Sequence, residues 1–173
     1  MNVAVRTFLR YILPVTMIAI LSIYLVSRTT GILHYALPNL PPMPEASVDR
    51  VEIDRGSSHV VLRRNGNSWL IDGPNYPANP KIIEDMIRAA ATLTITDLIA
   101  EEPTYNRYGL GQAESITATF LNGSRRLRVL TIGKRAPTYS HTYVLIDDDP
   151  RVYQAIGNLT QAFPAQEQIF RDR

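Results

Sequence analysis

The sequence contains no cysteine among its 173 residues. Disulfides, thiolate metal sites and a cysteine nucleophile are therefore excluded. A lipoprotein-type anchor, which needs an N-terminal cysteine, is excluded as well. The absence does not fix the compartment, because many exported proteins fold without disulfides.

Acidic residues are missing from the first 44 positions. This stretch holds Arg6, Arg10 and Arg28 and no Asp or Glu, whereas the remainder carries 15 Lys and Arg against 16 Asp and Glu. The sequence pI of about 9.0 is therefore a property of the N-terminal tail. A nucleic-acid-binding domain carries its positive charge on the folded body. The charge distribution thus argues against nucleic acid as a partner.

Motifs for catalysis and cofactor binding are also missing. There is no Gly-x-Gly-x-x-Gly, no Walker-type loop and no Gly-x-Ser-x-Gly elbow. His34, His59 and His141 show no metal-ligand spacing and are interpreted as surface or partly buried residues. We predict no enzymatic activity, no cofactor and no metal site, and infer no small-molecule substrate.

Three short polar runs could suggest chemistry but have plainer interpretations. Ser57–His59 and Ser140–His141 place hydroxyls beside imidazoles, but neighbours along a strand point to opposite faces, which argues against a triad. Asp147–Asp149 lacks the alternating ligands, central Gly and distal Glu of a calcium loop, and Pro150 follows directly. We predict a polar turn there.

A run of 17 uncharged residues separates Arg10 from Arg28. As a helix it spans roughly 25 Å, slightly less than the roughly 30 Å hydrocarbon core of a bilayer. It has no polar face, which disfavours a buried core helix. We predict a transmembrane anchor over residues 1–28, with these membrane-contacting residues: Tyr11, Ile12, Leu13, Val15, Met17, Ile18, Ile20, Leu21, Ile23, Tyr24, Leu25 and Val26.

A cleavable signal peptide is the alternative to this anchor, but the residues after Val26 offer no convincing pair of small residues for cleavage. Arg6 and Arg10 precede the run, so the positive-inside rule predicts a cytoplasmic N-terminus. The expected topology is single-pass, with an extracytoplasmic body. Residues 29–46 include four prolines between Leu37 and Pro44, which favours an extended linker.

The remaining residues, 47–173, predict β-hairpins. Val51 and Ile53 alternate with charged residues, as in a half-buried strand. Asn65-Gly66 and Asn122-Gly123 each lie between strand-like runs, and Asn-Gly favours a type I′ turn with positive φ at both residues. A third hairpin is expected around the polar turn, joining strands over residues 142–146 and 152–156.

One amphipathic helix is expected between the first two hairpins. Asn79 is a good N-cap and Pro80 a good first helical residue. Its apolar stripe contains Ile82, Ile83, Met86, Ile87, Ala90 and Leu93. A strand over residues 96–100 and a short helix over residues 159–163 complete the set. The predicted fold class is α+β: a mainly antiparallel sheet with one helix on one face and the other face open to solvent.

Basic residues are densest between positions 125 and 135. Arg126, Arg128, Lys134 and Arg135 are the candidate contacts for an acidic partner or for lipid headgroups, with Arg126 and Arg128 on one strand face. A solvated sheet face is the alternative. Tyr105, Tyr108, Tyr139 and Tyr143 belong either to a contact surface or to the core.

Several short motifs in the body resemble the bacterial family called domain of unknown function 4340. They are the hairpin centred on Trp69, Tyr76-Pro77-Ala78 before the helix, Tyr108-Gly109-Leu110, Ile132-Gly133, Tyr143-Val144, Val152-Tyr153 and the closing Phe170-Arg171-Asp172-Arg173. The resemblance covers about residues 48–173, and the chain is similar to a minimal, single-unit member.

This resemblance implies a membrane-anchored envelope protein of the bacterial inner membrane, and many members of the family are associated with ABC-type transport systems. It supplies no catalytic residues. We therefore expect a single-pass accessory or scaffold protein whose extracytoplasmic domain binds a protein partner in a multi-subunit membrane assembly. The alternatives are a small structural subunit whose transmembrane helix packs into a larger integral complex and, less favoured, an envelope enzyme.

Overall fold

The computed structural model of the chain describes residues 14–24, 37–73, 75–101, 104–138 and 140–171. They fall into two units, one within Met1–Ala36 and one comprising Leu37–Arg173. In the first unit, residues 14–24 are helical. No helix among the described residues is both long and apolar enough to cross a membrane. The predicted anchor residues Tyr11, Ile12, Leu13, Leu25 and Val26 lie outside the described residues.

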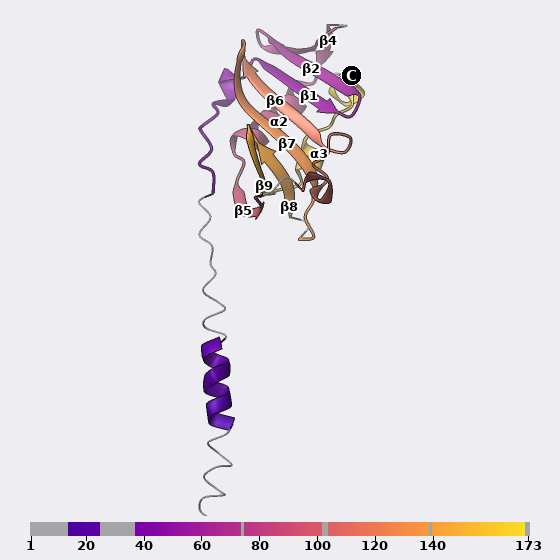
Figure 1. Cartoon of the computed structure of the whole chain (residues 1–173). Helices are drawn as coiled ribbons and strands as arrows, with labels where there is room; N and C mark the ends of the chain where they lie inside the picture. The colour runs from indigo at the N-terminus through magenta and orange to yellow at the C-terminus, as the bar shows by residue number, and fades with distance from the viewer. Residues whose placement is uncertain (1–13, 25–36, 74, 102–103, 139, 172–173) are drawn as a thin grey trace, which may run out of the picture. The chain divides into compact units, whose positions relative to one another are not determined.

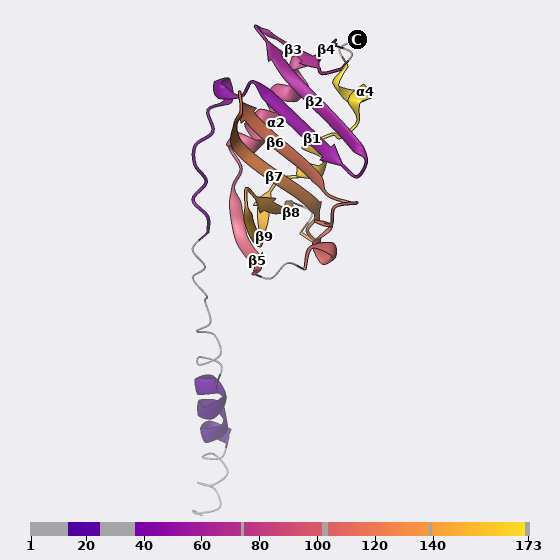
Figure 2. The same ribbon diagram turned by 45° about the horizontal axis from the view of Figure 1, so that its top comes forward.

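The second unit contains a nine-stranded sheet in the order β4-β3-β2-β1-β6-β7-β8-β9-β5 (Figures 1 and 2). Every neighbouring pair is antiparallel. The strands are β1 (Arg50–Arg55), β2 (Ser58–Asn65), β3 (Ser68–Ile71), β4 (Tyr76–Ala78), β5 (Ile95–Ala100), β6 (Ile116–Asn122), β7 (Arg125–Arg135), β8 (His141–Ile146) and β9 (Asp149–Ile156). The predicted mainly antiparallel α+β class is confirmed.

Four two-residue turns close the hairpins, and each has positive φ at its first residue. These residues are Gly56, Gly66, Gly123 and Asp147. The hairpins predicted at the two Asn-Gly pairs are confirmed, but the type I′ assignment is wrong. Asn65 and Asn122 end their strands, and only the glycine has positive φ, which is the sign pattern of a type II′ turn.

The predicted helix is α2 (Pro80–Ala91), which lies across one face of the sheet (Figure 1). The Asn79 side chain accepts a hydrogen bond from the Lys81 amide, as expected of an N-cap. Ile83, Met86, Ile87 and Ala90 are buried against the sheet. Leu93, predicted to continue the stripe, lies beyond the end of the helix and packs on the core from the following loop.

The C-terminal part of the unit closes the core around α2. The short helices α3 (Leu159–Ala162) and α4 (Glu167–Phe170) bury Leu159 and Phe170. The Asn79 amide donates to the Phe170 carbonyl at 2.7 Å, directly before α2 begins. The closing motif of the sequence therefore anchors the chain end at the start of the helix, next to β4 (Figure 2).

The second face of the sheet is not left open along its whole width. The 3-10 helix η2 (Tyr105–Tyr108) and the residues after it cover β8 and β9, where Tyr108, Leu110 and Val152 are buried together. The expectation of one fully wet face is wrong for this half of the sheet. Sequence periodicity could not indicate η2, because a single 3-10 turn is too short to show a repeat.

The boundary between tail and body lies earlier than the predicted residue 47, since the second unit begins at Leu37. Met43 is 5% exposed and belongs to the core, and Leu40 packs against it. The 3-10 helix η1 (Glu45–Ser47) then leads into β1. The segment predicted as an extended linker over residues 29–46 therefore belongs to the body from Leu37 onward, where Met43 is buried and Leu40 is half-buried.

Candidate functional site

A cavity of about 620 Å³ opens on the second face of the sheet, beside η2. We call it the basic hollow. Its walls come from four elements: Ile99 from β5, Arg107 and Tyr108 from η2, Lys134 and Arg135 from the end of β7, and Tyr143 from β8. Ala136 and Pro137, directly after β7, complete the lining.

Two glycines allow η2 to approach β7 closely. Gly109 ends η2 in the left-handed region at φ 66°, and a Cβ there would lie 3.0 Å from the Lys134 amide nitrogen. A Cβ on Gly133 would overlap the Tyr108 carbonyl oxygen and lie 2.9 Å from a carbon of Leu110. Only residues without a side chain permit this contact. It sets the position of Arg107 and Tyr108 relative to Lys134.

Aromatic rings form the inner wall of the basic hollow. The centroids of Tyr108 and Tyr143 lie 4.9 Å apart at an interplanar angle of 59°, a tilted arrangement that aromatic pairs favour. Tyr108 is buried and Tyr143 is half-buried. Both residues belong to the second apolar cluster, and both also line the hollow. Tyr139 lies outside the described residues.

The rim of the basic hollow is cationic. Arg107, Lys134 and Arg135 are all exposed, and no Asp or Glu occurs among the described residues of the lining. Like charges gathered in a concave surface focus a positive potential and raise the local concentration of anions. The site is therefore suited to an anionic group with an apolar part, and the residues of its lining that the structure describes include no acid paired with a base.

The four basic residues predicted from the sequence do not form one surface. Lys134 and Arg135 line the basic hollow, whereas Arg126 lies outside its lining, 3.4 Å from Asp148. Arg107 joins the site from η2 and was missed, since it stands alone among uncharged residues in the sequence. The only signal near it was the Tyr108-Gly109-Leu110 motif.

The prediction that Arg128 belongs to a contact surface is wrong, because its side chain is buried, with 1% exposure. On β7 it shares its face with Leu130 and Ile132, which both belong to the core. Its guanidinium donates to the Ala90 carbonyl in the last turn of α2 and to the Pro41 carbonyl at 2.5 Å. It is not available to a headgroup or a partner.

Burial lowers the pKa of Arg128 below its ordinary value, and the charge of Asp147 partly opposes this shift. The Nε atom has no hydrogen-bond partner within the described part of the chain. Because the last carbonyls of a helix carry partial negative charge, a cation at Ala90 is favourable. Arg128 thus connects the Pro-rich segment and α2 to the centre of the sheet.

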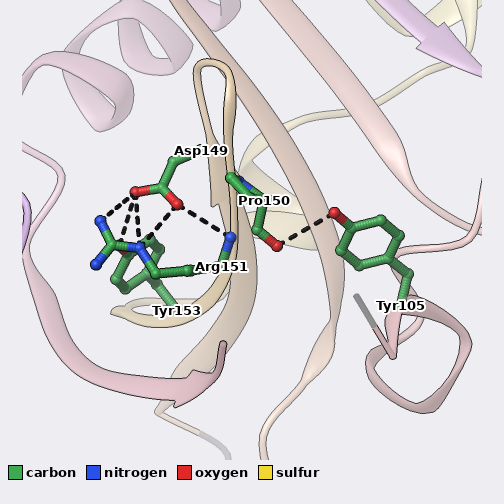
Figure 3. Close-up of polar contacts among 5 residues, drawn as sticks. All are labelled: Tyr105, Asp149, Pro150, Arg151 and Tyr153. Carbon is green, nitrogen blue, oxygen red and sulfur yellow. Dashed lines mark hydrogen bonds and ion pairs between the residues drawn. The ribbon is translucent and has the colours of Figure 1, made fainter. Parts of the chain in front are cut away.

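A second polar centre lies at the start of β9 (Figure 3). The Asp149 carboxylate accepts hydrogen bonds from Arg151 Nη2 at 2.6 Å and Nε at 2.9 Å, and from the Arg151 amide at 3.0 Å. The Tyr153 hydroxyl donates to it at 2.8 Å. From the other side of the strand, the Tyr105 hydroxyl donates to the Pro150 carbonyl at 3.1 Å.

These contacts explain the ionisation of the group. The hydrogen bonds from Arg151 lower the pKa of Asp149 to about 2, and the pairing raises the pKa of Arg151. Burial, followed by the hydrogen bond to Asp149, raises the pKa of Tyr153 to about 12. A carboxylate already engaged by four donors is poorly suited to act as a base or a metal ligand. We assign this centre to the stability of β9.

The remaining polar runs make hydrogen bonds that account for their side chains. His59 Nδ1 lies 2.6 Å from Asp54 Oδ1, and Ser58 Oγ donates to the Ala165 carbonyl. Ser140 Oγ and Thr138 Oγ1 both approach His141 Nδ1, at 2.9 and 3.1 Å. Ser140 precedes β8, so the strand argument that placed it opposite His141 does not apply there. His34 lies outside the described residues.

The acidic run is a turn, as predicted. Asp147 and Asp148 connect β8 to β9, and Asp147 Oδ1 accepts a hydrogen bond from the Val129 amide at 2.8 Å. Among the described residues, no group of three or more His, Cys, Asp or Glu is placed to hold a metal ion.

An antiparallel sheet with α2 on one face and η2 on the other defines an α+β domain. The model of the family described as Domain of unknown function (DUF4340) matches residues 69–173. The chain belongs to this family. The match begins at Trp69 in β3, so β1 and β2, which the resemblance had been expected to include, lie before it. No curated protein and no solved structure matches the chain.

Four of the seven motifs that carried the family resemblance lie together in space, whereas the motifs at Trp69, Tyr76 and Phe170 lie elsewhere, around β4 and the start of α2. Tyr108-Gly109-Leu110 contacts Ile132-Gly133, Tyr143 packs on Tyr108, and Val152 lies in the same apolar cluster. Three of these four motifs contribute to, or directly border, the basic hollow. The motifs therefore position this site as well as the fold.

Proposed function

We propose that this chain is a single-pass membrane-anchored accessory protein whose extracytoplasmic body binds a protein partner in a multi-subunit membrane assembly. The observation that carries the proposal is that four of the seven motifs gather at a concave, cationic and aromatic site. Interfaces are enriched in Tyr and Arg, and this site has both. An ABC-type transport system is the assembly that the family resemblance suggests.

The anchor and the orientation are part of the proposal. The uncharged run between Arg10 and Arg28 supports a bilayer-spanning helix, and the arginines before it support a cytoplasmic N-terminus. The body then lies in the periplasm, or outside the cell. A lining of cations and tyrosines supports binding better than catalysis, since it offers no nucleophile with an adjacent base.

The test is affinity purification of the full chain in mild detergent, followed by mass spectrometry of the co-purifying proteins. In a second chain, residues 1–36 are exchanged for an unrelated single-pass anchor. We expect the same integral membrane partner with both chains. Loss of the partner on exchange would instead favour the structural subunit whose helix packs into a larger complex. A monomer that purifies alone from both preparations would contradict the proposal.

A further inference from the structure

The rim of the basic hollow brings together cations that are distant in the sequence. Arg107 comes from η2, while Lys134 and Arg135 come from the end of β7. The close contact of Gly109 with the Lys134 amide fixes these two elements against each other. Three cations at the rim of one concave surface favour the binding of an anion.

The floor of the hollow is largely apolar. Besides the three cations, the described lining consists of Ile99, Tyr108, Ala136, Pro137 and Tyr143. An inorganic anion gains nothing from such a floor. A ligand that carries an apolar group beside its negative charge would use both parts of the site.

The size of the hollow points the same way. A volume of about 620 Å³ lies in the range of sites that hold organic ligands or side chains, and exceeds what one phosphate or carboxylate fills. The cations border a concavity, whereas an anionic bilayer presents a plane of charge and fits a flat basic face. Arg125 and Arg126, also exposed on β7, lie outside the lining. These observations favour a peptide over a lipid surface.

We propose that the basic hollow binds an acidic segment of the partner protein, with an apolar side chain packed against Tyr108 and Tyr143. Carboxylates next to that side chain pair with Arg107, Lys134 and Arg135. This inference rests on the proposed function and names the chemistry of the partner. Arginine pairs with carboxylates in bidentate geometry, and aromatic walls bind apolar side chains, so the two parts of the site select different features of one segment.

The test uses the full chain in nanodiscs of neutral phosphatidylcholine and a phage-displayed library of random dodecapeptides. We expect the wild-type chain to enrich peptides with at least two Asp or Glu next to Phe, Tyr, Trp or Leu. Affinity for a selected peptide should fall about ten-fold or more in Lys134→Glu and in Arg107→Glu. Arg125→Glu, on the same strand but outside the hollow, should change it less than about two-fold.

Three outcomes would overturn the inference: no enrichment, enrichment without acidic residues, or equal weakening by Arg125→Glu and Lys134→Glu. Sedimentation with phosphatidylglycerol vesicles provides a further arm. The wild-type chain could bind these vesicles while enriching no peptide. If Lys134→Glu abolished that vesicle binding, the hollow would be assigned to lipid headgroups. Lys134→Gln and the far-ultraviolet circular dichroism of each variant separate loss of charge from loss of fold.

The partner purification distinguishes failure of this inference from failure of the proposed function. If Lys134→Glu retains the partner as well as the wild-type chain does, the hollow is not the docking site, and the accessory role stands. If the anchor-exchanged chain loses the partner, the proposed role of the body fails. Loss of the partner in Lys134→Glu, but not in Arg125→Glu, supports both.

Discussion

The backbone of Gly133 lies against the carbonyl oxygen of Tyr108, so closely that a methyl group at residue 133 would overlap that oxygen. Gly133→Ala should therefore destabilise the body by about 3 kcal/mol, because neither the Tyr108 carbonyl nor the Leu110 side chain has room to move far. Chemical unfolding followed by circular dichroism measures the change. Tyr108 should shift as well, which weakens any ligand of the basic hollow.

Gly123→Ala is the matched control for this prediction. Gly123 has φ +57° and nothing within 4 Å of its Cβ position, so Ala there should destabilise by about 1 kcal/mol from backbone strain alone. Gly123→Asn should recover most of that loss of stability, since Asn tolerates the left-handed region. Gly133→Asn should destabilise the body more than Gly133→Ala does. Equal effects of Ala at the two sites would contradict the close-contact explanation.

Arg128 should contribute far more to stability than its neighbour Arg126. Arg128→Ala removes a buried stem and leaves the Ala90 and Pro41 carbonyls without their donors, which should lower the free energy of unfolding by about 3 kcal/mol. Arg126→Ala removes an exposed side chain with one long ion pair and should change it by less than about 0.5 kcal/mol.

Limited proteolysis gives a second measurement of the role of Arg128. Once the Pro41 carbonyl has lost its donor, the segment 37–44 should open more often and be cleaved faster in Arg128→Ala than in the wild-type chain. If cleavage there is unchanged while global stability falls, Arg128 stabilises α2 alone, and its role in holding the Pro-rich segment is contradicted.

The sequence predicted the hairpins because glycine is needed wherever a two-residue turn has positive φ, and Asn-Gly marks such positions. It misplaced the turns by one residue, since the Asn-Gly pair favours type I′ while the observed pairing puts Asn65 and Asn122 in the strands. At the fourth turn Asp147 takes the glycine position, which turn statistics alone do not specify.

The sequence predicted only some of the residues that line the candidate site. Lys134 and Arg135 are adjacent and stood out as basic, but Arg107 enters from η2, whose position depends on the Gly133 contact. Arg128 was misassigned because a period of two gives two faces and does not say which is buried. The buried face is the one that carries Leu130 and Ile132, and Arg128 shares it with these two core residues.

The Asp149–Arg151 pair should make the free energy of unfolding depend on pH in the acidic range. The pKa of Asp149 is about 2 in the folded state, below the ordinary value of 3.8. The pair therefore stabilises the fold above pH 4, and this contribution is lost as the pH falls from 4 towards 2. Solvent at Arg151 screens the pair, so the loss of stability on acidification should be small. Urea unfolding at several pH values measures it.

Variants of this pair separate the causes of the shift. Asp149→Asn and Arg151→Met should both flatten the pH dependence between 4 and 2, because the Arg151 hydrogen bonds are the largest cause of the lowered pKa. Tyr153→Phe removes a smaller contribution and should leave most of the dependence in place. A flat profile in Tyr153→Phe, with the normal profile in Arg151→Met, would contradict this order.

Asp147 combines a strained backbone with a hydrogen bond, and four variants at this position can tell which matters more. Its φ is 52°, and it satisfies both backbone groups of Val129: its amide donates to the Val129 carbonyl and its Oδ1 accepts from the Val129 amide, each at 2.8 Å.

Asn keeps the acceptor and tolerates this φ, so Asp147→Asn should stay within about 0.5 kcal/mol of wild type. Asp147→Gly relieves the backbone but loses the acceptor, and should destabilise by about 1 kcal/mol. Asp147→Ala loses the acceptor and keeps the strain, for about 2 kcal/mol. Asp147→Ser, with a shorter acceptor, should fall between Asn and Ala. Urea unfolding gives the order, and a Gly variant more stable than Asn would mean that backbone strain outweighs the bond to Val129.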